Sequence, residues 1–381
     1  MYDLLRGLRI IDLSTVVLGP YATQLLADMG ADVIKVEPKG GDVFRTARPG
    51  RDGGDGAGFL NLNRNKKSIV LDLTDGTDHA LLMDLVSTAD VFVHNLRDRS
   101  AAKNRIDYET ISKRRPRIVY CHARGFGRGV SASEPAYDDC IQASAGLAWL
   151  NADDHGMPRF VRSLVCDKVA GLHLAFAIAA GVLARERNGK GVQIELPMYE
   201  AMASFLLVEQ LSGQTFVPPL PDRGYVRLNA DGRRPHKTKD GFIAIMPYTA
   251  AQWSRFLKAI GRDDLVHSSL ISDDEYRSQN IDQLYQIIAR VAPSKTTEDW
   301  LLLLRDADVP VAPVNRLDDL PNDDHLLSVN FFKHISHPAE GALLSASSPF
   351  VVVGGVDQPD RPAPVLDGDR AAIVSDLNRR A

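Results

Sequence analysis

The sequence contains few cysteines and none of the familiar metal-binding patterns. Cys121, Cys140 and Cys166 are scattered along 381 residues without metal-ligand spacing, and the ten histidines include no HExxH pair. Isolated thiols in an otherwise ordinary composition favour reduced cysteines in a cytoplasmic protein over a disulfide-stabilised secreted one. The sequence therefore predicts neither a metal centre nor a disulfide framework.

A strong charge imbalance and long apolar runs are also missing. The formal net charge is −4, which gives no reason to expect a nucleic acid or a polybasic membrane anchor. No window reaches about 18 uninterrupted apolar residues, and the start, MYDLLRGLRIIDLS, lacks the apolar stretch of a signal peptide. We therefore expect a soluble protein with no nucleic-acid partner and no membrane partner.

No GxGxxG follows the first expected strand, residues 8–13, so a dinucleotide cofactor is not supported. A helix at 21–30 and a second apolar strand at 31–38 come next, which is typical of a right-handed parallel unit. Strands at 67–73, 90–96 and 116–127 and a helix at 79–89 continue the pattern, which indicates an α/β fold with a doubly wound sheet. Ligands of such sheets bind beyond the carboxyl ends of the strands. The expected site walls are thus the loops after Leu13, Glu37, Asn95 and Gly125.

A proline-rich passage at residues 217–224 divides the chain. After it come a turn at 239–241, a strand, an amphipathic helix ended by Gly261, and two further helices at 281–293 and 296–308. These elements predict a smaller α/β unit. We expect a large domain at 1–215, completed by 325–381 packing back on it, and a small domain at 216–324.

The clearest local pattern runs from Cys166 to Pro197. Asp167 precedes a segment with helical apolar spacing, where a side-chain oxygen caps the first free N–H groups. One interpretation is an N-cap that contributes about 1 kcal/mol and performs no chemistry. The other is a carboxylate nucleophile that the positive end of the helix keeps ionised. Spacing alone does not choose between them. After the helix, residues 192–196 are predicted to form a buried strand stopped by Pro197.

Two kinds of surface segment have an open role. The stretch at 40–58, rich in Gly, Arg and Asp, fits a solvated connector or a loop that covers a ligand. Positive charge gathers at 63–67 and again at 97–105. These basic residues suit a solvated face or, at the expected ligand edge, an anionic ligand that carries phosphate.

Several segments, in order, resemble the class III CoA-transferases, the family that includes formyl-CoA transferase, carnitine CoA-transferase and 2-methylacyl-CoA racemase. They are GLRIIDLS, GPYATQLLADMGADVIKVE, NLNRNKKSIVLDL, VHNLR, GFG, YDDCIQASAG, CDKVAGLHLAFAIAAGVLARERNGKGVQIELPMYEAM, TKDGFIAI and VPVAPVN. The resemblance implies a large Rossmann-like domain, a small domain and an interlocked, ring-like homodimer. It also implies no permanently bound cofactor, with a coenzyme A thioester as co-substrate and a carboxylic acid as acceptor.

By the same resemblance, Asp167 is the nucleophile that attacks an acyl-CoA donor, with succinyl-CoA a candidate, to give a mixed anhydride and then an aspartyl-CoA thioester. The substrate-binding candidates are Tyr137, Gln142, Val17 and Leu18. For Tyr137 and Gln142, ordinary helix packing is an equal alternative. The CoA-binding candidates are Val16, Lys39, Leu71, Asn95, Leu96, Arg97 and Lys103.

The sequence also departs from the family pattern. Val17 stands where formyl-CoA transferases often have glutamine, which argues against oxalate and formate as substrates. Racemases of the family carry a histidine before an aspartate where this chain has Tyr137-Asp138. A tyrosine with an ordinary pKa near ~10 is a poor base for an α-proton. A racemase acting by α-proton transfer is therefore the second hypothesis, and a non-catalytic CoA-binding subunit is the third.

Overall fold

A computed structural model of the protein describes residues 2–221, 227–355 and 358–380. The chain divides into two compact units, Met1–Leu206 with His325–Ala381, and Leu207–Asp324. The sequence had placed the corresponding boundaries after residue 215 and at residue 325. Residues 222–224 of the proline-rich passage lie outside the described residues.

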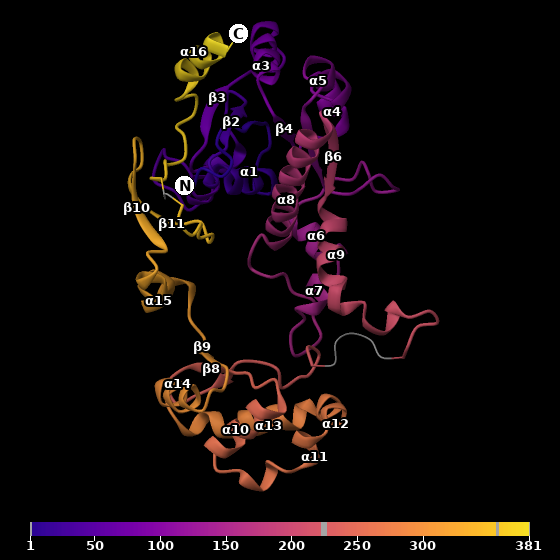
Figure 1. Ribbon diagram of the computed structural model, residues 1–381, viewed down its shortest axis with the longest axis vertical. Helices are drawn as coiled ribbons and strands as arrows, with labels where there is room; N and C mark the ends of the chain where they lie inside the picture. Colours follow the sequence, from indigo (N-terminus) through magenta and orange to yellow (C-terminus); the bar gives the residue numbers. More distant parts are fainter. Residues whose placement is uncertain (1, 222–226, 356–357, 381) are drawn as a thin grey trace. The chain divides into compact units, whose positions relative to one another are not determined.

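Six parallel strands form the central sheet of the first unit (Figure 1). In sheet order they are β3 (Lys67–Val70), β2 (Asp32–Glu37), β1 (Arg9–Asp12), β4 (Val91–His94), β5 (Val119–Arg124) and β6 (Val192–Pro197). The order reverses between β1 and β4, which is the point where ligands of doubly wound sheets bind. The α/β prediction is confirmed, and the strand order places the expected crevice beside the loops after β1 and β4.

Side chains of successive strand residues alternate between two apolar cores. Ile10, Val93 and Cys121 belong to one core, whereas Ile11, Phe92 and Tyr120 belong to the other. Both faces of the sheet are buried, which accounts for the nearly continuous apolar strands in the sequence.

Helices contribute to both cores. The first core includes residues of α1 (Leu18–Asp28), α6 (Asp138–Ser144), α8 (Val165–Asn188) and α9 (Met198–Gln210). The second includes residues of α3 (Gly76–Ser87), α4 (Asp98–Lys103), α5 (Tyr108–Arg114) and α16 (Arg370–Arg380). The C-terminal helix α16, yellow in Figure 1, lies next to β3, so the end of the chain packs on the first unit.

The segment at 40–58 is structured. It contains η1 (Val43–Thr46) and the start of α2 (Ala57–Leu62), and the Asp55 N–H donates to Glu340 Oε1 at 2.8 Å. Glu340 lies in the turn between β10 (Phe332–His337) and β11 (Gly341–Ala346). These contacts favour an ordered connector over a free loop. The remaining helices of this unit are α7 (Leu147–Leu150) and α15 (Asp324–Ser328).

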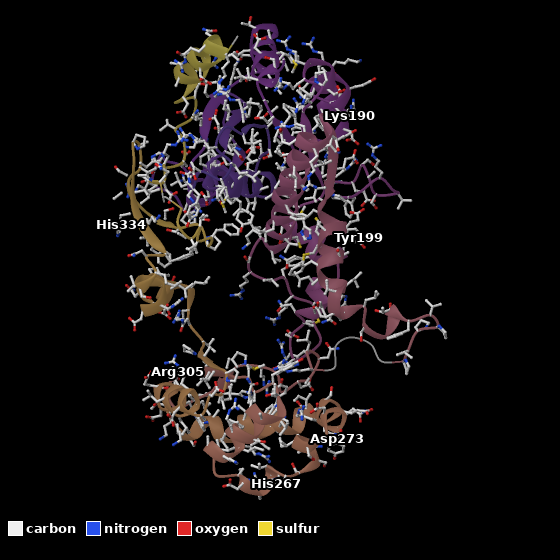
Figure 2. All side chains as sticks on the ribbon, viewed as in Figure 1. Lys190, Tyr199, His267, Asp273, Arg305 and His334 are labelled. Atoms are coloured by element: carbon white, nitrogen blue, oxygen red, sulfur yellow. The ribbon has the colours of Figure 1, made fainter. Side chains whose placement is uncertain are left out.

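The second unit has its own core, around Trp253, Phe256, Tyr285 and Trp300. Exposed residues such as His267, Asp273 and Arg305, labelled in Figure 2, lie outside that core. Its strands are β7 (His236–Lys237), β8 (Phe242–Ile245) and β9 (Val311–Pro313). Its helices are η2 (Ser212–Thr215), α10 (Ala250–Ala259), η3 (Asp263–Leu265), α11 (Ser269–Ser272), α12 (Asp274–Gln279), α13 (Ile281–Val291), η4 (Ala292–Ser294), α14 (Thr297–Asp306) and η5 (Leu317–Asn322).

Strand β6 differs from the sequence prediction. It was expected to be buried, but it lies at the edge of the sheet and its residues are partly exposed. Its apolar residues face the first core on one side only, since Ile194 packs there whereas Gln193 does not.

Within the described residues, α8 alone has the length and composition of a membrane-crossing helix. Its most apolar 18-residue window is 44% buried inside the structure, and core helices pass the same test. The length and composition of α8 are therefore weak evidence for a membrane span.

Candidate active site

A cavity of about 570 Å³ opens at the carboxyl ends of β1, β4 and β5. It lies where the strand order reverses, as expected for this sheet topology. The sequence candidates that line it are Val16, Leu18, Asn95, Leu96, Arg97, Tyr137 and Asp167.

Asp167 enters this cavity from the first turn of α8, but it does not cap the helix as the sequence predicted. The helix begins at Val165, and Leu164 in the N-cap position makes no side-chain cap hydrogen bond. The N–H of Asp167 is one of the free donors of the first turn, and it donates to Asp138 Oδ1 at 3.0 Å. The capping carboxylate is thus Asp138, which leaves the Asp167 side chain free for chemistry.

The environment raises the pKa of Asp167 to about 7. Burial is the main cause, and the negative charge of Asp138 adds to it. The sequence hypothesis had the helix end keeping Asp167 ionised, whereas a pKa near neutrality leaves about half of the molecules protonated at pH 7. The shift is thus opposite in direction to the one that the sequence hypothesis invoked.

Asp138 is itself held by Gln142, one turn later on α6. Gln142 Nε2 donates to Asp138 Oδ2 at 2.6 Å, and Gln142 Oε1 accepts the Val161 N–H at 2.8 Å. Gln142 is fully buried. Its amide is occupied by these contacts, so the structure favours the packing role over contact with a reacting carbonyl.

The loop after β1 forms another wall, and side chains from β4 and from the β2 loop fix its backbone. Asn95 accepts the Thr15 N–H at 3.1 Å and donates to the Thr15 carbonyl at 2.9 Å. Asp42 Oδ1 accepts the Val16 N–H at 3.1 Å. Hydrogen bonds thus hold the backbone at Thr15 and Val16. Helix α1 begins two residues after Val16, at Leu18.

The Gly125-Phe126-Gly127 loop closes the cavity beyond β5. Gly125 lies against Ala136, and its carbonyl accepts the Tyr199 N–H at 3.0 Å. Gly127 donates its N–H to Glu200 Oε1 at 2.9 Å. Helix α9, which carries Tyr199 as labelled in Figure 2, therefore anchors this loop beside the cavity.

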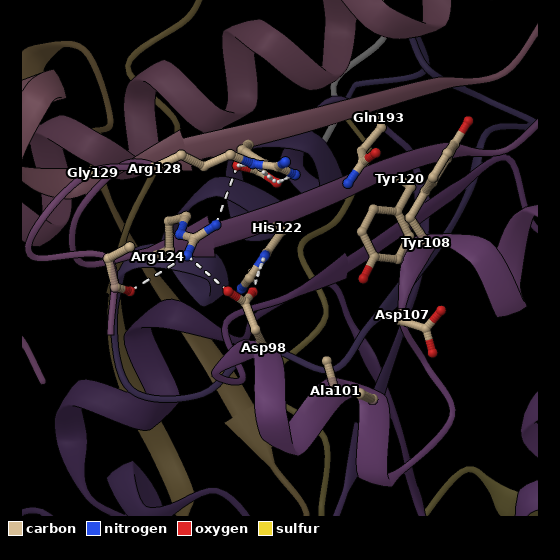
Figure 3. Close-up of a pocket in the computed structure, with 13 residues that line it drawn as sticks. Asp98, Ala101, Asp107, Tyr108, Tyr120, His122, Arg124, Arg128, Gly129 and Gln193 are labelled. Atoms are coloured by element: carbon tan, nitrogen blue, oxygen red, sulfur yellow. Dashed lines mark hydrogen bonds and ion pairs between the residues drawn. The ribbon is translucent and has the colours of Figure 1, made fainter. Parts of the chain in front are cut away.

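A second cavity, of about 550 Å³, shares Asp98, His122 and Arg124 with the first (Figure 3). Arg124 pairs with Asp98 at 2.9 Å and with Glu195 at 3.2 Å. Burial lowers the pKa of His122, so this imidazole is mainly neutral at pH 7. The shared wall is therefore made of charges that already have partners.

The other sequence candidates lie outside the lining of the cavity. Val17 and Leu71 are buried apolar residues, and Gln142 is buried beside Asp138. Lys39 is exposed and pairs with Asp72 at 3.1 Å, and Lys103 is an exposed residue at the end of α4. A side-chain contact from Val17, Leu71 or Gln142 to a ligand in the cavity is thus not supported.

Burial raises the pKa of the neighbouring Cys166 thiol to about 12, and the residue belongs to the core. A thiol that stays protonated in an apolar core is chemically inert. Within the described part of the chain, no three His, Cys, Asp or Glu side chains gather in a way that would hold a metal ion.

Sequence reasoning missed the roles of Asp138 and Asp42. Asp138 was noted only as the neighbour of Tyr137, although it lies four residues before Gln142 on one helix face, a spacing that brings the two side chains together. Asp42 sits in a Gly-rich loop, and no local pattern links it to Val16, which lies 26 residues earlier.

Residues 5–370 match the model of CoA-transferase family III. The succinyl-CoA:mesaconate CoA-transferase of Haloarcula hispanica is 31% identical over 98% of this chain and 96% of its own length. The human succinyl-CoA:glutarate CoA-transferase is 29% identical over 98% of this chain and 86% of its own. The crystal structure of a CaiB/BaiF family protein from Brucella suis superposes with a TM-score of 0.83 at 26% identity, covering 99% of this chain and all of the other. The chain belongs to CoA-transferase family III, and it is an enzyme of that class.

Proposed function

We propose that the protein moves CoA from an acyl-CoA donor to a carboxylic acid acceptor through a covalent intermediate on Asp167. The observation that carries the proposal is a carboxylate with a free side chain and a pKa near neutrality, placed in a cavity at the switch point of the sheet. Two of the relatives described above are named for succinyl-CoA with mesaconate or glutarate. Succinyl-CoA with a small dicarboxylic acid is thus the first pair to test.

In the first half-reaction, an Asp167 oxygen attacks the thioester carbonyl, the C–S bond breaks and CoA leaves as a thiolate. The product is a mixed anhydride between Asp167 and the donor acyl group. The thiolate then attacks the aspartyl carbonyl of the anhydride, which releases the donor acid as a carboxylate and leaves CoA on Asp167 as a thioester.

In the second half-reaction, the acceptor carboxylate attacks the aspartyl thioester and releases CoA thiolate again. The thiolate attacks the acyl carbonyl of this second anhydride, giving the new acyl-CoA and free Asp167. The overall reaction consumes no water, oxidant or proton, so the free energy of the thioester is conserved in the product. Excluding water from the intermediates is therefore a requirement, because hydrolysis would waste them.

The residues around Asp167 have separate tasks in this scheme. Burial and Asp138 make the carboxylate more basic than a solvated one, and the first turn of α8 favours its ionised form. Arg97 lines the cavity and is the basic residue among the sequence candidates there that could bind a CoA phosphate. Lys39 and Lys103 would attract the phosphates only from the exposed rim.

The racemase alternative requires a second proton carrier opposite Asp167. Of the described residues that line the cavity, His122 is the one histidine. Its Nε2 contacts the Leu96 carbonyl at 2.8 Å and its Nδ1 lies 3.6 Å from Asp98. Because the contact with the Leu96 carbonyl uses Nε2 as the donor, the neutral imidazole has no second N–H to give to an α-carbon, which supports the transferase better than the racemase.

Mass spectrometry of the Asp167 peptide tests the proposal. After incubation with succinyl-CoA and hydroxylamine, we expect a hydroxamate on that peptide, because hydroxylamine traps an activated aspartyl carbonyl. Asp167→Ala should abolish both the adduct and acceptor-dependent CoA exchange while the protein stays folded. Asp139→Ala, on the same helix as Asp138 and exposed, is the matched control and should retain both.

Other results would point elsewhere. Solvent deuterium at the α-carbon of a branched acyl-CoA, without exchange between acids, would identify the racemase. CoA binding with neither reaction would identify a binding subunit. Near-normal turnover of Asp167→Ala would exclude a nucleophilic role for this residue.

We also propose that two copies of the chain form the active enzyme. On α8, opposite the buried face, Leu172, Phe176 and Leu183 are exposed, and Phe176 is 76% exposed. Large apolar side chains grouped on a helix near a site are typical of an interface. The resemblance to a family of interlocked homodimers makes a second copy the expected partner.

A further inference from the structure

The loop from Ser14 to Leu18 contains a strained residue at the edge of the candidate active site. Val16 has a φ of 71°, in the left-handed region that β-branched residues strongly avoid. Val16 also lines the cavity together with Asp167 and Asn95. Glycine would adopt this backbone without strain, but it would leave no side chain in the cavity. A valine here therefore needs an external group that holds its conformation.

Asp42 supplies that group. Its Oδ1 accepts the Val16 N–H at 3.1 Å, and its Oδ2 pairs with Lys35 Nζ at 2.8 Å. Both side chains of this ion pair are completely buried. Lys35 also donates to the Ser14 carbonyl at 2.8 Å. Lys35 thus holds the loop at Ser14, and Asp42 holds it at Val16.

The position of Asp42 is fixed in turn by β2 and η1. Its own N–H donates to Glu37 Oε2 at 2.9 Å, and its Oδ1 also accepts the Phe44 N–H at 2.9 Å. Glu37 is locked by Arg45, whose Nη2 lies 2.7 Å from Glu37 Oε1. Strand β2 pairs with β1 in the sheet. This network of hydrogen bonds and ion pairs therefore attaches the loop after β1 to the neighbouring strand.

We propose that Asp42, held by Lys35, is a positioning residue that keeps Val16 in the left-handed conformation and so orients the Thr15–Leu18 segment for the acyl-CoA thioester. The inference rests on the proposed function for the identity of the ligand. The role differs from that of Asn95, which binds Thr15 and itself lines the cavity. Asp42 is not among the cavity-lining residues, so it acts through Val16.

The test is whether glycine at position 16 removes the need for Asp42. Asp42→Ala should lower kcat/KM for acyl-CoA by roughly 10-fold or more, because Val16 then leaves the strained conformation. Asp42→Asn should lose less activity, since its side-chain oxygen still accepts the Val16 N–H, but it should lose stability because its NH2 group faces the buried Lys35 ammonium. Val16→Gly alone should cost a few-fold, through the lost side chain. In Val16→Gly/Asp42→Ala we expect kcat/KM close to that of Val16→Gly, because glycine holds the backbone unaided.

Asp28→Ala is the matched control. Asp28 is a buried carboxylate paired with Arg64 at 2.6 Å, and it makes no contact with the loop. The Asp28→Ala variant should have lower thermal stability but an unchanged kcat/KM. Adding Val16→Gly to Asp28→Ala should have the same effect on kcat/KM as Val16→Gly alone. Where Asp42→Ala leaves Lys35 unpaired and fails to fold, Lys35→Met/Asp42→Ala is compared with Lys35→Met/Asp42→Asn. Both double variants lose the Lys35 bond to the Ser14 carbonyl, so they differ only in the acceptor for the Val16 N–H.

Losses that multiply in Val16→Gly/Asp42→Ala would overturn the inference, since Asp42 would then act independently of Val16. Acyl-CoA affinity, measured by calorimetry on the same variants, should show the same coupling. If the wild-type protein binds acyl-CoA but transfers no CoA, the proposed function fails. The coupling in affinity then still decides whether Asp42 positions the loop.

Discussion

At Asp167, opposing influences act on one carboxyl group. The first turn of α8 favours a negative charge, whereas burial and Asp138 favour the protonated form and raise the pKa to about 7. A more basic carboxylate is a better nucleophile, but only its ionised fraction reacts. The site therefore combines basicity with a substantial ionised population near neutral pH.

Replacing Asp138 by asparagine should move this balance. In the proposed mechanism the ionised form of Asp167 attacks the thioester, so the rate of aspartyl acylation should rise with pH and reach half of its maximum near pH 7 in the wild type. Asp138→Asn removes a negative charge, which lowers the pKa of Asp167, so the midpoint should shift to lower pH. Burial persists in the variant, so the midpoint should stay above the ordinary value of 3.8. Single-turnover acylation measured across the pH range gives both midpoints.

The control for this experiment is thermal stability. The new amide of Asp138→Asn faces the donor Nε2 of Gln142, so some loss of stability is expected whatever the effect on Asp167. The shift of the midpoint, not the stability, is the decisive readout. A midpoint that stays in place or rises would mean that Asp138 does not set the pKa of Asp167.

The sequence singled out Asp167 as a candidate nucleophile but did not indicate the residues around it. Helical spacing located the start of α8 to within a few residues, which is why Asp167 was taken for the cap. The true cap is Asp138, which lies 29 residues earlier in the chain. Its carboxylate reaches the helix only because α6 packs on α8, and no local pattern contains that contact.

Among the helices, the crossing of α1 and α8 brings the two walls of the site together. An added Cβ at Gly171 of α8 would lie 2.8 Å from the Leu18 carbonyl oxygen, a backbone atom of α1. The small residues that the sequence shows at the start of α8 therefore serve close backbone contact. The same contact sets the distance between Asp167 and the loop that ends at Leu18.

Gly171→Ala should thus separate the two helices and lower both stability and activity. Overpacking at a backbone atom costs about 1–3 kcal/mol, which exceeds the gain of up to about 1 kcal/mol from the better helix propensity of alanine. Gly181→Ala on the same helix is the matched control. Its Cβ would lie 2.9 Å from side-chain atoms of Ile194 and Val119, so this variant should also lose stability, but it should keep kcat/KM because it lies ten residues further along α8 from the α1 contact. Thermal unfolding and kcat/KM of both variants provide the comparison, and equal effects would show that the α1 contact has no special role.

Elements with strong periodicity were predictable from sequence, and short or edge elements were not. Strands β1, β2 and β4 are buried on both faces, and short apolar runs such as Ile10-Ile11 and Val91-Phe92-Val93 mark them in the sequence. The hairpin of β10 and β11 was missed, because its exposed residues alternate weakly and its stability comes from contacts such as that of Glu340 with residue 55. The edge position of β6 was not predicted, because its apolar residues resemble those of a central strand.

At the scale of the whole molecule, the sequence resemblance led to the family, and the family match over residues 5–370 confirms it. The arrangement of the candidate CoA site could be predicted from the sequence only in part. Residues contiguous with a strand end, such as Asn95, Leu96 and Arg97, line the cavity, and their contact with CoA stays a prediction. Residues such as Leu71 and Lys39 were assigned by alignment, and their burial or exposure depends on packing that alignment does not contain.

The proposed homodimer leads to a prediction about the exchange of subunits. If two 41.8-kDa chains are interlocked as in the family, they cannot separate without unfolding. Two populations that differ by a mass tag should then show only parental dimers in native mass spectrometry after days together under native conditions. Unfolding and refolding of the mixture should produce mixed dimers, which serves as the control that the tags permit assembly.

The unfolding temperature should also rise with protein concentration, because folding and association are coupled. Mixed dimers formed without unfolding would exclude interlocking, and a monomeric mass at working concentrations would exclude the dimer itself, leaving the exposed apolar residues of α8 to another partner.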